Sequence, residues 1–169
     1  AIVVWLILRW SQNTEKTGNI RNILLISYML GLASGVHLLN LLALPFIALI
    51  VYYKRFEFKL ITFLITGLTS IGIYLFIYQG MIKGLPTLAA NYNLSVPIIL
   101  VLIILSITIY TIIKKNKELS TVFACIMLVF IGYTSYTTIF IRATQHPAIN
   151  ENNPDTIDRA LSYLNRDQY

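Results

Sequence analysis

Four long stretches of the chain contain no Asp, Glu, Lys or Arg: residues 23–53, 60–82, 84–113 and 119–141. They are 31, 23, 30 and 23 residues long. A helix needs about 20 apolar residues to cross the hydrocarbon core of a bilayer. Because backbone polar groups in lipid must be paired internally, such stretches fold as helices. We therefore predict an all-α fold, a polytopic bundle of transmembrane helices.

The composition supports a membrane protein and excludes a nucleic-acid-binding one. Of the 169 residues, 57% are hydrophobic and only 12% are charged, whereas soluble domains carry about 25% charged residues. The net charge is +6, but no basic run interleaved with aromatic residues forms a nucleic-acid groove. Membrane lipid is the expected surrounding, and we expect no nucleic-acid partner.

The basic residues predict the orientation of the bundle. They concentrate in three short connections, residues 9–22, 54–59 and 114–118. Cytoplasmic loops of membrane proteins are enriched in Lys and Arg. We therefore expect these three connections to face the cytoplasm. The connection around Lys83 and the tail, residues 142–169, are then expected to face outward.

The first charge-free stretch is too long for a single crossing. At 1.5 Å per residue, residues 23–53 would measure roughly 46 Å, against a hydrocarbon core of about 30 Å. A single helix would also place two basic flanks on opposite sides. We therefore predict a helical hairpin with its turn near Gly35, because glycine allows a backbone break. Pro45 is expected to kink the second limb.

The remaining segments follow from the same pattern. The segment 84–93 contains turn-forming and polar residues and is predicted to be an outer loop, with a short interfacial helix as an option. The chain opens inside an apolar run and stops abruptly, which we interpret as an internal fragment of a longer protein. We predict helical spans, or ends of spans, at residues 1–10, 23–34, 38–53, 60–79, 96–113 and 119–141.

The tail contains a second, short helical signal. Asn153 is a suitable N-cap and Pro154 a suitable first residue, so we predict an outward-facing helix at residues 154–164. Its apolar side chains recur at spacings of four and three, which indicates one apolar stripe. The stripe consists of Ile157, Leu161 and Leu164.

The strongest polar candidate inside the apolar runs is His37. Ionisable groups at membrane depth are costly and often functional. Asn40 follows three residues later, on the same face if the segment is helical. Together they can form a polar contact at the floor of an outward cavity. The alternative is a histidine that only hydrogen-bonds a neighbouring helix.

The tail supplies the other candidates for substrate or donor binding. Arg142 suits phosphate recognition through its fork of donors, although a juxtamembrane arginine is usually only an interface anchor. His146 can act as a base or contact an anion, or be a solvated loop residue. We find no metal motif, phosphate-binding loop or nucleophile motif, so we expect no metal and no cofactor. The remaining candidates are Asn150, Asn153 and Arg166.

Two separated motifs carry a resemblance to a known family. Residues 31–45 form one motif, and residues 141–142, 147–154 and 161–169 form the other. Both resemble the signatures of DUF2723, a bacterial membrane family similar to the GT-C glycosyltransferases, which include protein O-mannosyltransferases. The departures are Ala148, where the family pattern has proline, and Asp167, where it has glutamate.

The resemblance implies a function for the full-length protein. It would be an integral-membrane glycosyltransferase of the bacterial inner (plasma) membrane, with the tail in the periplasm. Such enzymes transfer a sugar from a polyprenyl-phosphate donor to a protein or glycan acceptor on the outer face. The implied catalytic acid lies in an outer loop upstream of this chain, so we expect the fragment alone to be inactive.

Two other functions remain compatible with the sequence. A membrane transporter or lipid flippase is supported by the broken first run, because discontinuous helices often line substrate paths. No charge lies within any predicted span and no inverted repeat is visible, which disfavours this reading. A non-enzymatic membrane subunit is equally consistent with the featureless apolar spans.

Overall fold

The computed structural model describes residues 2–12 and 16–165 of the chain, and within these ranges it contains helices and no β-strand. This confirms the predicted all-α class. The elements are α1 (Ile2–Gln12), α2 (Lys16–Val36), the 3₁₀-helix η1 (Leu38–Leu42), α3 (Ala43–Arg55), α4 (Leu60–Leu75), the π-helix η2 (Phe76–Lys83), α5 (Gly84–Asn91), α6 (Ser95–Ile113), α7 (Lys117–Thr134), α8 (Thr137–Ala143) and α9 (Ile157–Asn165).

Within the described residues, three helical runs are long and apolar enough to cross a membrane: Leu60–Asn91, Ser95–Ile113 and Lys117–Ala143. The first joins α4, η2 and α5 without interruption. The short helix that the predicted outer loop allowed is present as α5, but it continues directly from η2 without an intervening loop. Pro86 lacks an N–H, and the π-helical winding just before it is the kind of adjustment that accommodates proline in membrane helices.

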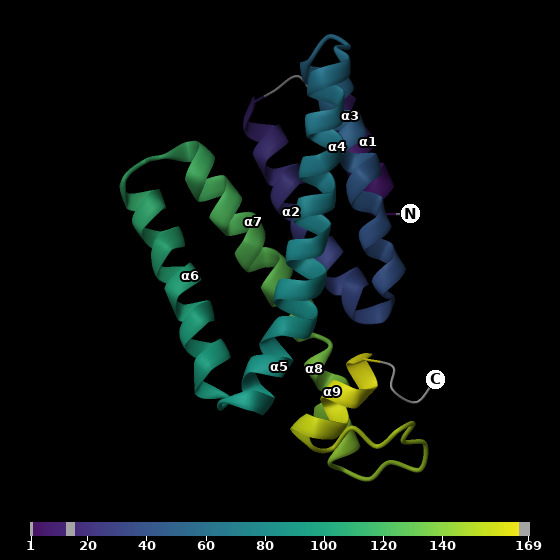
Figure 1. Cartoon of the computed structure of the whole chain (residues 1–169). Helices are drawn as coiled ribbons and strands as arrows, with labels where there is room; N and C mark the ends of the chain where they lie inside the picture. Colours follow the sequence, from purple (N-terminus) through teal and green to yellow (C-terminus); the bar gives the residue numbers. More distant parts are fainter. Residues whose placement is uncertain (1, 13–15, 166–169) are drawn as a thin grey trace.

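The connections between helices gather at two opposite ends of the bundle. The start of α2, the α3–α4 connection and the α6–α7 connection lie at the upper end in Figure 1. The 3₁₀-helix η1, helix α5 and the segment from α8 to α9 lie at the lower end (Figure 1). The basic connections around 54–59 and 114–118 thus share one end, and α5, which follows Lys83 directly, and the described part of the tail lie toward the other.

The run 23–53 is broken into α2, η1 and α3, and α2 and α3 run in opposite directions (Figure 1). The break falls at His37, whose backbone is extended (φ −154°, ψ 116°), and not at Gly35, which stays helical. The break lies two residues after Gly35 and falls between the predicted spans 23–34 and 38–53. Pro45 lies in the first turn of α3, where a missing N–H costs little, so it starts the second limb.

Helices α2 and α7 make the most extensive contact between described helices, and glycines allow it. A Cβ on Gly132 would lie 2.5 Å from the backbone oxygen of Tyr28, and a Cβ on Gly31 would collide with the Val129 carbonyl group. Gly35 lies one turn further along. A Cβ added to Gly35 would lie 3.3 Å from the Cβ of Tyr136. Glycines four residues apart are the usual means of close helix approach in membranes.

Side-chain packing adds two apolar cores to this glycine contact. One core joins α1, α2 and α3 through buried residues such as Leu6, Trp10 and Leu30. The Lys54 ammonium donates to the Trp10 carbonyl oxygen at 2.6 Å and lies 4.5 Å from the centre of the Trp10 ring. The other core joins η1, η2 and α7, and its members include Leu41.

Replacing Gly132 by alanine tests the glycine contact. Gly132→Ala must push the α2 backbone away, and overpacking of this kind costs about 1–3 kcal/mol. We expect the melting temperature of the intact protein in detergent to fall by several degrees. The matched control is Gly67→Ala on α4, where a Cβ meets nothing within 4 Å. An unchanged melting temperature in Gly132→Ala would show that the two backbones do not touch.

A candidate site between the hairpin break and the tail

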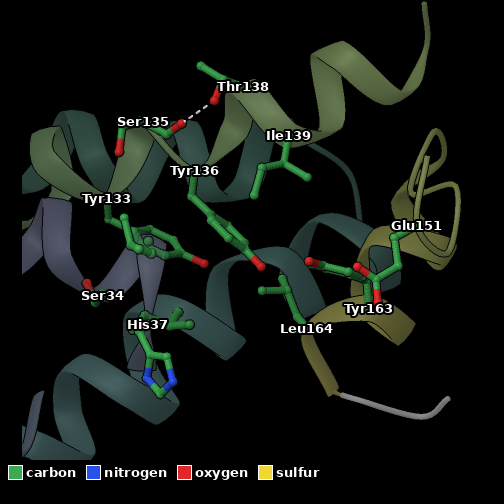
Figure 2. A pocket seen from close by; sticks show the side chains of 13 residues that line it. Ser34, His37, Tyr133, Ser135, Tyr136, Thr138, Ile139, Glu151, Tyr163 and Leu164 are labelled. Carbon is green, nitrogen blue, oxygen red and sulfur yellow. Dashed lines mark hydrogen bonds between the residues drawn. The ribbon is translucent and has the colours of Figure 1, made fainter. Parts of the chain in front are cut away.

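A cavity of about 860 Å³ lies where the hairpin break, the α7–α8 junction and the tail meet. This volume is within the ~300–1,000 Å³ range of small-molecule sites. It lies at the end of the bundle opposite the basic connections. Figure 2 shows its lining: Ser34, Gly35, Val36, His37, Ile82, Tyr133, Ser135, Tyr136, Thr138, Ile139, Glu151, Tyr163 and Leu164.

The α7–α8 junction forms one wall of the cavity and is built around Tyr136. The rings of Tyr133 and Tyr136 stack with centroids 5.6 Å apart, and Phe140 packs edge-on against Tyr136 at 5.5 Å. The Ser135 hydroxyl donates to the Gly132 carbonyl oxygen at 2.8 Å, and the Thr138 hydroxyl donates to the Ser135 carbonyl oxygen at 2.7 Å. These contacts fix the direction in which the two tyrosines enter the cavity (Figure 2).

The tail forms the opposite wall. Helix α9 packs against α5 and η2, and its Leu164 is buried. This docking directs Tyr163 toward the cavity, and Glu151 enters it from the preceding loop (Figure 2). The hydroxyls of Tyr136 and Tyr163 point toward one another across the space (Figure 2).

A polar network shapes the loop that carries Glu151. The Asn150 amide donates to the Asn153 side-chain oxygen at 2.5 Å and to the Ala143 carbonyl oxygen at 3.4 Å. The Asn153 amide donates to the Asp155 carboxylate at 3.2 Å. Asn152 and Asn153 both have a left-handed backbone (φ 58° and 40°), a conformation that asparagine tolerates better than most residues.

The predicted helix of the tail begins later than expected. Helix α9 starts at Ile157 and ends at Asn165, whereas the sequence predicted 154–164 with Asn153 as its N-cap. The left-handed backbone of Asn153 belongs to a turn and is unlike the extended conformation of an N-cap. The Thr156 hydroxyl instead accepts a hydrogen bond from the Arg159 backbone N–H at 3.4 Å.

His37 and Asn40 play different parts in the structure. His37 lines the cavity at its rim, and in Figure 2 its ring points away from the tyrosine hydroxyls. Its Nδ1 accepts a hydrogen bond from the Leu39 backbone N–H at 3.3 Å. Asn40 does not line the cavity, and its amide donates to the Ala33 carbonyl oxygen at 2.9 Å. The expected shared helical face is therefore wrong, because His37 itself is extended.

The tail candidates are dispersed. Arg142 lines a separate hollow of about 430 Å³, together with Thr138, Ile139, Ile141 and Gln145. His146 is exposed, has a left-handed backbone (φ 49°) and lines neither space. Asn150 and Asn153 line neither space and hold the loop instead. Arg166 lies outside the described residues.

Sequence reasoning missed the residues that give the cavity its character. Glu151 and Tyr163 lie within the tail motifs of the family resemblance but were not singled out. For Tyr133 and Tyr136, the sequence showed only that they are aromatic residues near the end of a span. A carboxylate within a polar loop that follows a span was the one available clue to Glu151.

The N-terminal part of the chain matches a known family. Residues 1–62 match the model described as the Protein O-mannosyl-transferase TMEM260 N-terminal domain. The matched segment contains α1, α2, η1 and α3. It therefore includes Gly31, Gly35 and the rim residue His37, whereas the α7–α8 and tail walls lie beyond it. Neither a curated protein nor a solved structure matches the chain significantly.

The pairing of Asp155 with Arg159 makes the tail sensitive to acid. The hydrogen bond from the Arg159 guanidinium, at 2.8 Å, holds the pKa of the Asp155 carboxyl below its ordinary value. A lowered pKa in the folded state means that the pairing stabilises the tail above the ordinary Asp pKa of about 3.9. This contribution is lost as the pH falls through the folded-state pKa.

We expect Arg159→Gln to raise the pKa of Asp155 toward its ordinary value, as followed by carboxyl-carbon NMR titration of the intact protein. Arg142→Gln is the control, because it removes a cation from the same end without contacting Asp155. An Asp155 titration that is identical in the wild-type protein and Arg159→Gln would contradict the pairing.

Proposed function

We propose that the chain is part of an integral-membrane glycosyltransferase similar to protein O-mannosyltransferases. It would transfer a sugar from a polyprenyl-phosphate donor to a protein or glycan acceptor on the outer face of the membrane. The match of residues 1–62 to the Protein O-mannosyl-transferase TMEM260 N-terminal domain carries this proposal.

The geometry of the bundle supports the same function. A lipid-linked donor lies with its chain in the bilayer and its phosphate and sugar at the interface. The cavity of about 860 Å³ lies at one end of apolar helices that are long enough to span. The adjoining hollow carries Arg142, whose planar guanidinium suits a phosphate group. We assign the donor phosphate to Arg142 and the outward face to this end.

The orientation is tested by labelling with a membrane-impermeant maleimide in intact cells. In a Cys125→Ala background, a cysteine replacing Ile149, which is 88% exposed, should react from outside. A cysteine replacing Lys114 should react only after the membrane is opened, because Lys-rich connections stay in the cytoplasm. Labelling in the reverse order would place the cavity on the cytoplasmic side and contradict the proposal.

The assignment of Arg142 is tested by sugar transfer with the full-length protein, a polyprenyl-phosphate mannose donor and a peptide acceptor. Loss of a hydrogen bond to a charged group costs about 1.5–3 kcal/mol. Arg142→Ala should therefore raise the KM for the donor roughly 10- to 150-fold. Lys83→Ala is the matched control, because it removes a cation from the same end and lines neither space.

The outcomes of this assay separate the alternatives. Equal donor KM values for Arg142→Ala and Lys83→Ala would remove Arg142 from the donor site. Movement of the donor across vesicle membranes without any transfer to the peptide would indicate a lipid flippase instead of an enzyme. The absence of both activities in the full-length protein would favour a non-enzymatic subunit.

A further inference from the structure

The larger cavity and its neighbouring hollow differ in charge. The hollow contains the guanidinium of Arg142. Among the residues that the structure describes, the lining of the larger cavity contains no Lys or Arg and instead contains the carboxylate of Glu151. The two spaces share Thr138 and Ile139, so α8 forms a common wall between them. One ligand can therefore place an anionic group in the hollow, near Arg142, and a neutral group in the larger cavity on the other side of α8.

The larger cavity is poorly suited to a phosphate group. A carboxylate repels a phosphate, and placing like charges side by side opposes binding. The described part of the lining contains no arginine or lysine that would offset this repulsion. Tyrosine hydroxyls donate and accept hydrogen bonds, and a carboxylate only accepts them. This set of groups fits a ligand that has many hydroxyl donors and no negative charge.

The tyrosine rings add the apolar part of the same recognition. Tyr133 and Tyr136 stack with 22° between their ring planes, which keeps both rings in one orientation. Tyrosine combines an apolar ring face with a polar tip. A sugar ring has the matching character, with C–H groups on its faces and hydroxyls around its edge. Tyr163 presents a third hydroxyl from the opposite wall (Figure 2).

We propose that the larger cavity binds a neutral sugar ring, whose hydroxyls are held by the Glu151 carboxylate and by the hydroxyls of Tyr136 and Tyr163. This inference rests on the proposed glycosyl transfer and assigns the sugar and the phosphate to separate spaces on the two sides of α8. The sugar has two possible sources, the donor and a glycan acceptor, which share this chemistry.

Asn150 and Asn153 position Glu151 in this arrangement. They flank it in the chain, and their side chains hydrogen-bond each other at 2.5 Å. The second hydrogen bond of Asn150, to the Ala143 carbonyl oxygen, ties the loop to the last residue of α8. The two asparagines therefore act through Glu151 and are positioning residues, in place of the direct ligand contacts that the sequence suggested.

The binding experiment uses the purified intact protein and two probes, methyl α-mannoside and inorganic phosphate, followed by ligand-observed NMR. Methyl α-mannoside should bind, and phosphate should not compete with it. Glu151→Gln should weaken methyl α-mannoside binding roughly 10-fold or more, as expected for loss of a charged hydrogen-bond acceptor. Asp158→Asn is the matched control, because it removes a carboxylate of the same tail that does not line the cavity.

The results that would overturn the inference are specific. They are undetectable binding of methyl α-mannoside to the wild-type protein, competition by phosphate, or an unchanged affinity in Glu151→Gln. If Glu151→Gln does not fold, Tyr163→Phe provides the same test by removing one hydroxyl from the cavity, and it should weaken binding severalfold. An affinity equal to the wild-type value in Tyr163→Phe would then overturn the inference.

Transfer kinetics of the full-length protein show whether the bound sugar belongs to the donor or to the acceptor, and they test the proposed function separately from the sugar site. A raised KM for the donor in Glu151→Gln assigns the cavity to the donor sugar, and a raised KM for a glycosylated acceptor assigns it to the acceptor. Glu151-dependent methyl α-mannoside binding without any transfer would refute the enzyme and retain the sugar site. Transfer with unchanged sugar affinity in Glu151→Gln would retain the enzyme and refute the sugar site.

Discussion

The contact between the backbones of α2 and α7 is the constraint on which the rest of the structure depends. In lipid, apolar side chains gain nothing by leaving their surroundings, so helices associate through close packing and polar contacts. Gly31 and Gly132 permit this packing, because a Cβ at either position would meet backbone atoms of the facing helix. Most large apolar side chains of α4 and α6 remain exposed, as expected for surfaces that face lipid.

The same contact determines where the cavity forms. Gly35 continues the glycine seam by one turn and meets Tyr136 at the end of α7. The hairpin breaks two residues later, at His37, and α7 ends two residues before Tyr136, at Thr134. Two helices that pack closely therefore both end at this level. The space beyond their ends is closed by the tail, which docks through α9 onto α5 and η2.

At this end of the bundle, the two sides of α8 differ in charge. Arg142 lies on the side of the smaller hollow, whereas Glu151 and the tyrosines face the larger cavity. A lipid-phosphate sugar has the same division, with a charged phosphate next to a neutral ring. The proposed sugar site follows from this correspondence, whereas the proposed transfer function rests on the family match of residues 1–62, and each is open to a separate experiment.

The sequence by itself determined the helical class, the apolar runs, the need for a break within residues 23–53 and the grouping of the basic connections. These features depend on composition and on periodicity along the chain, which lipid constrains strongly. It placed the break near Gly35, two residues before the observed one, and it started the tail helix at Pro154, three residues too early. Left-handed asparagines and an extended histidine decided those boundaries locally. Only the tertiary structure brought Tyr136, Glu151 and Tyr163 to one cavity, because their meeting depends on how closely α2 and α7 approach and on where α9 docks.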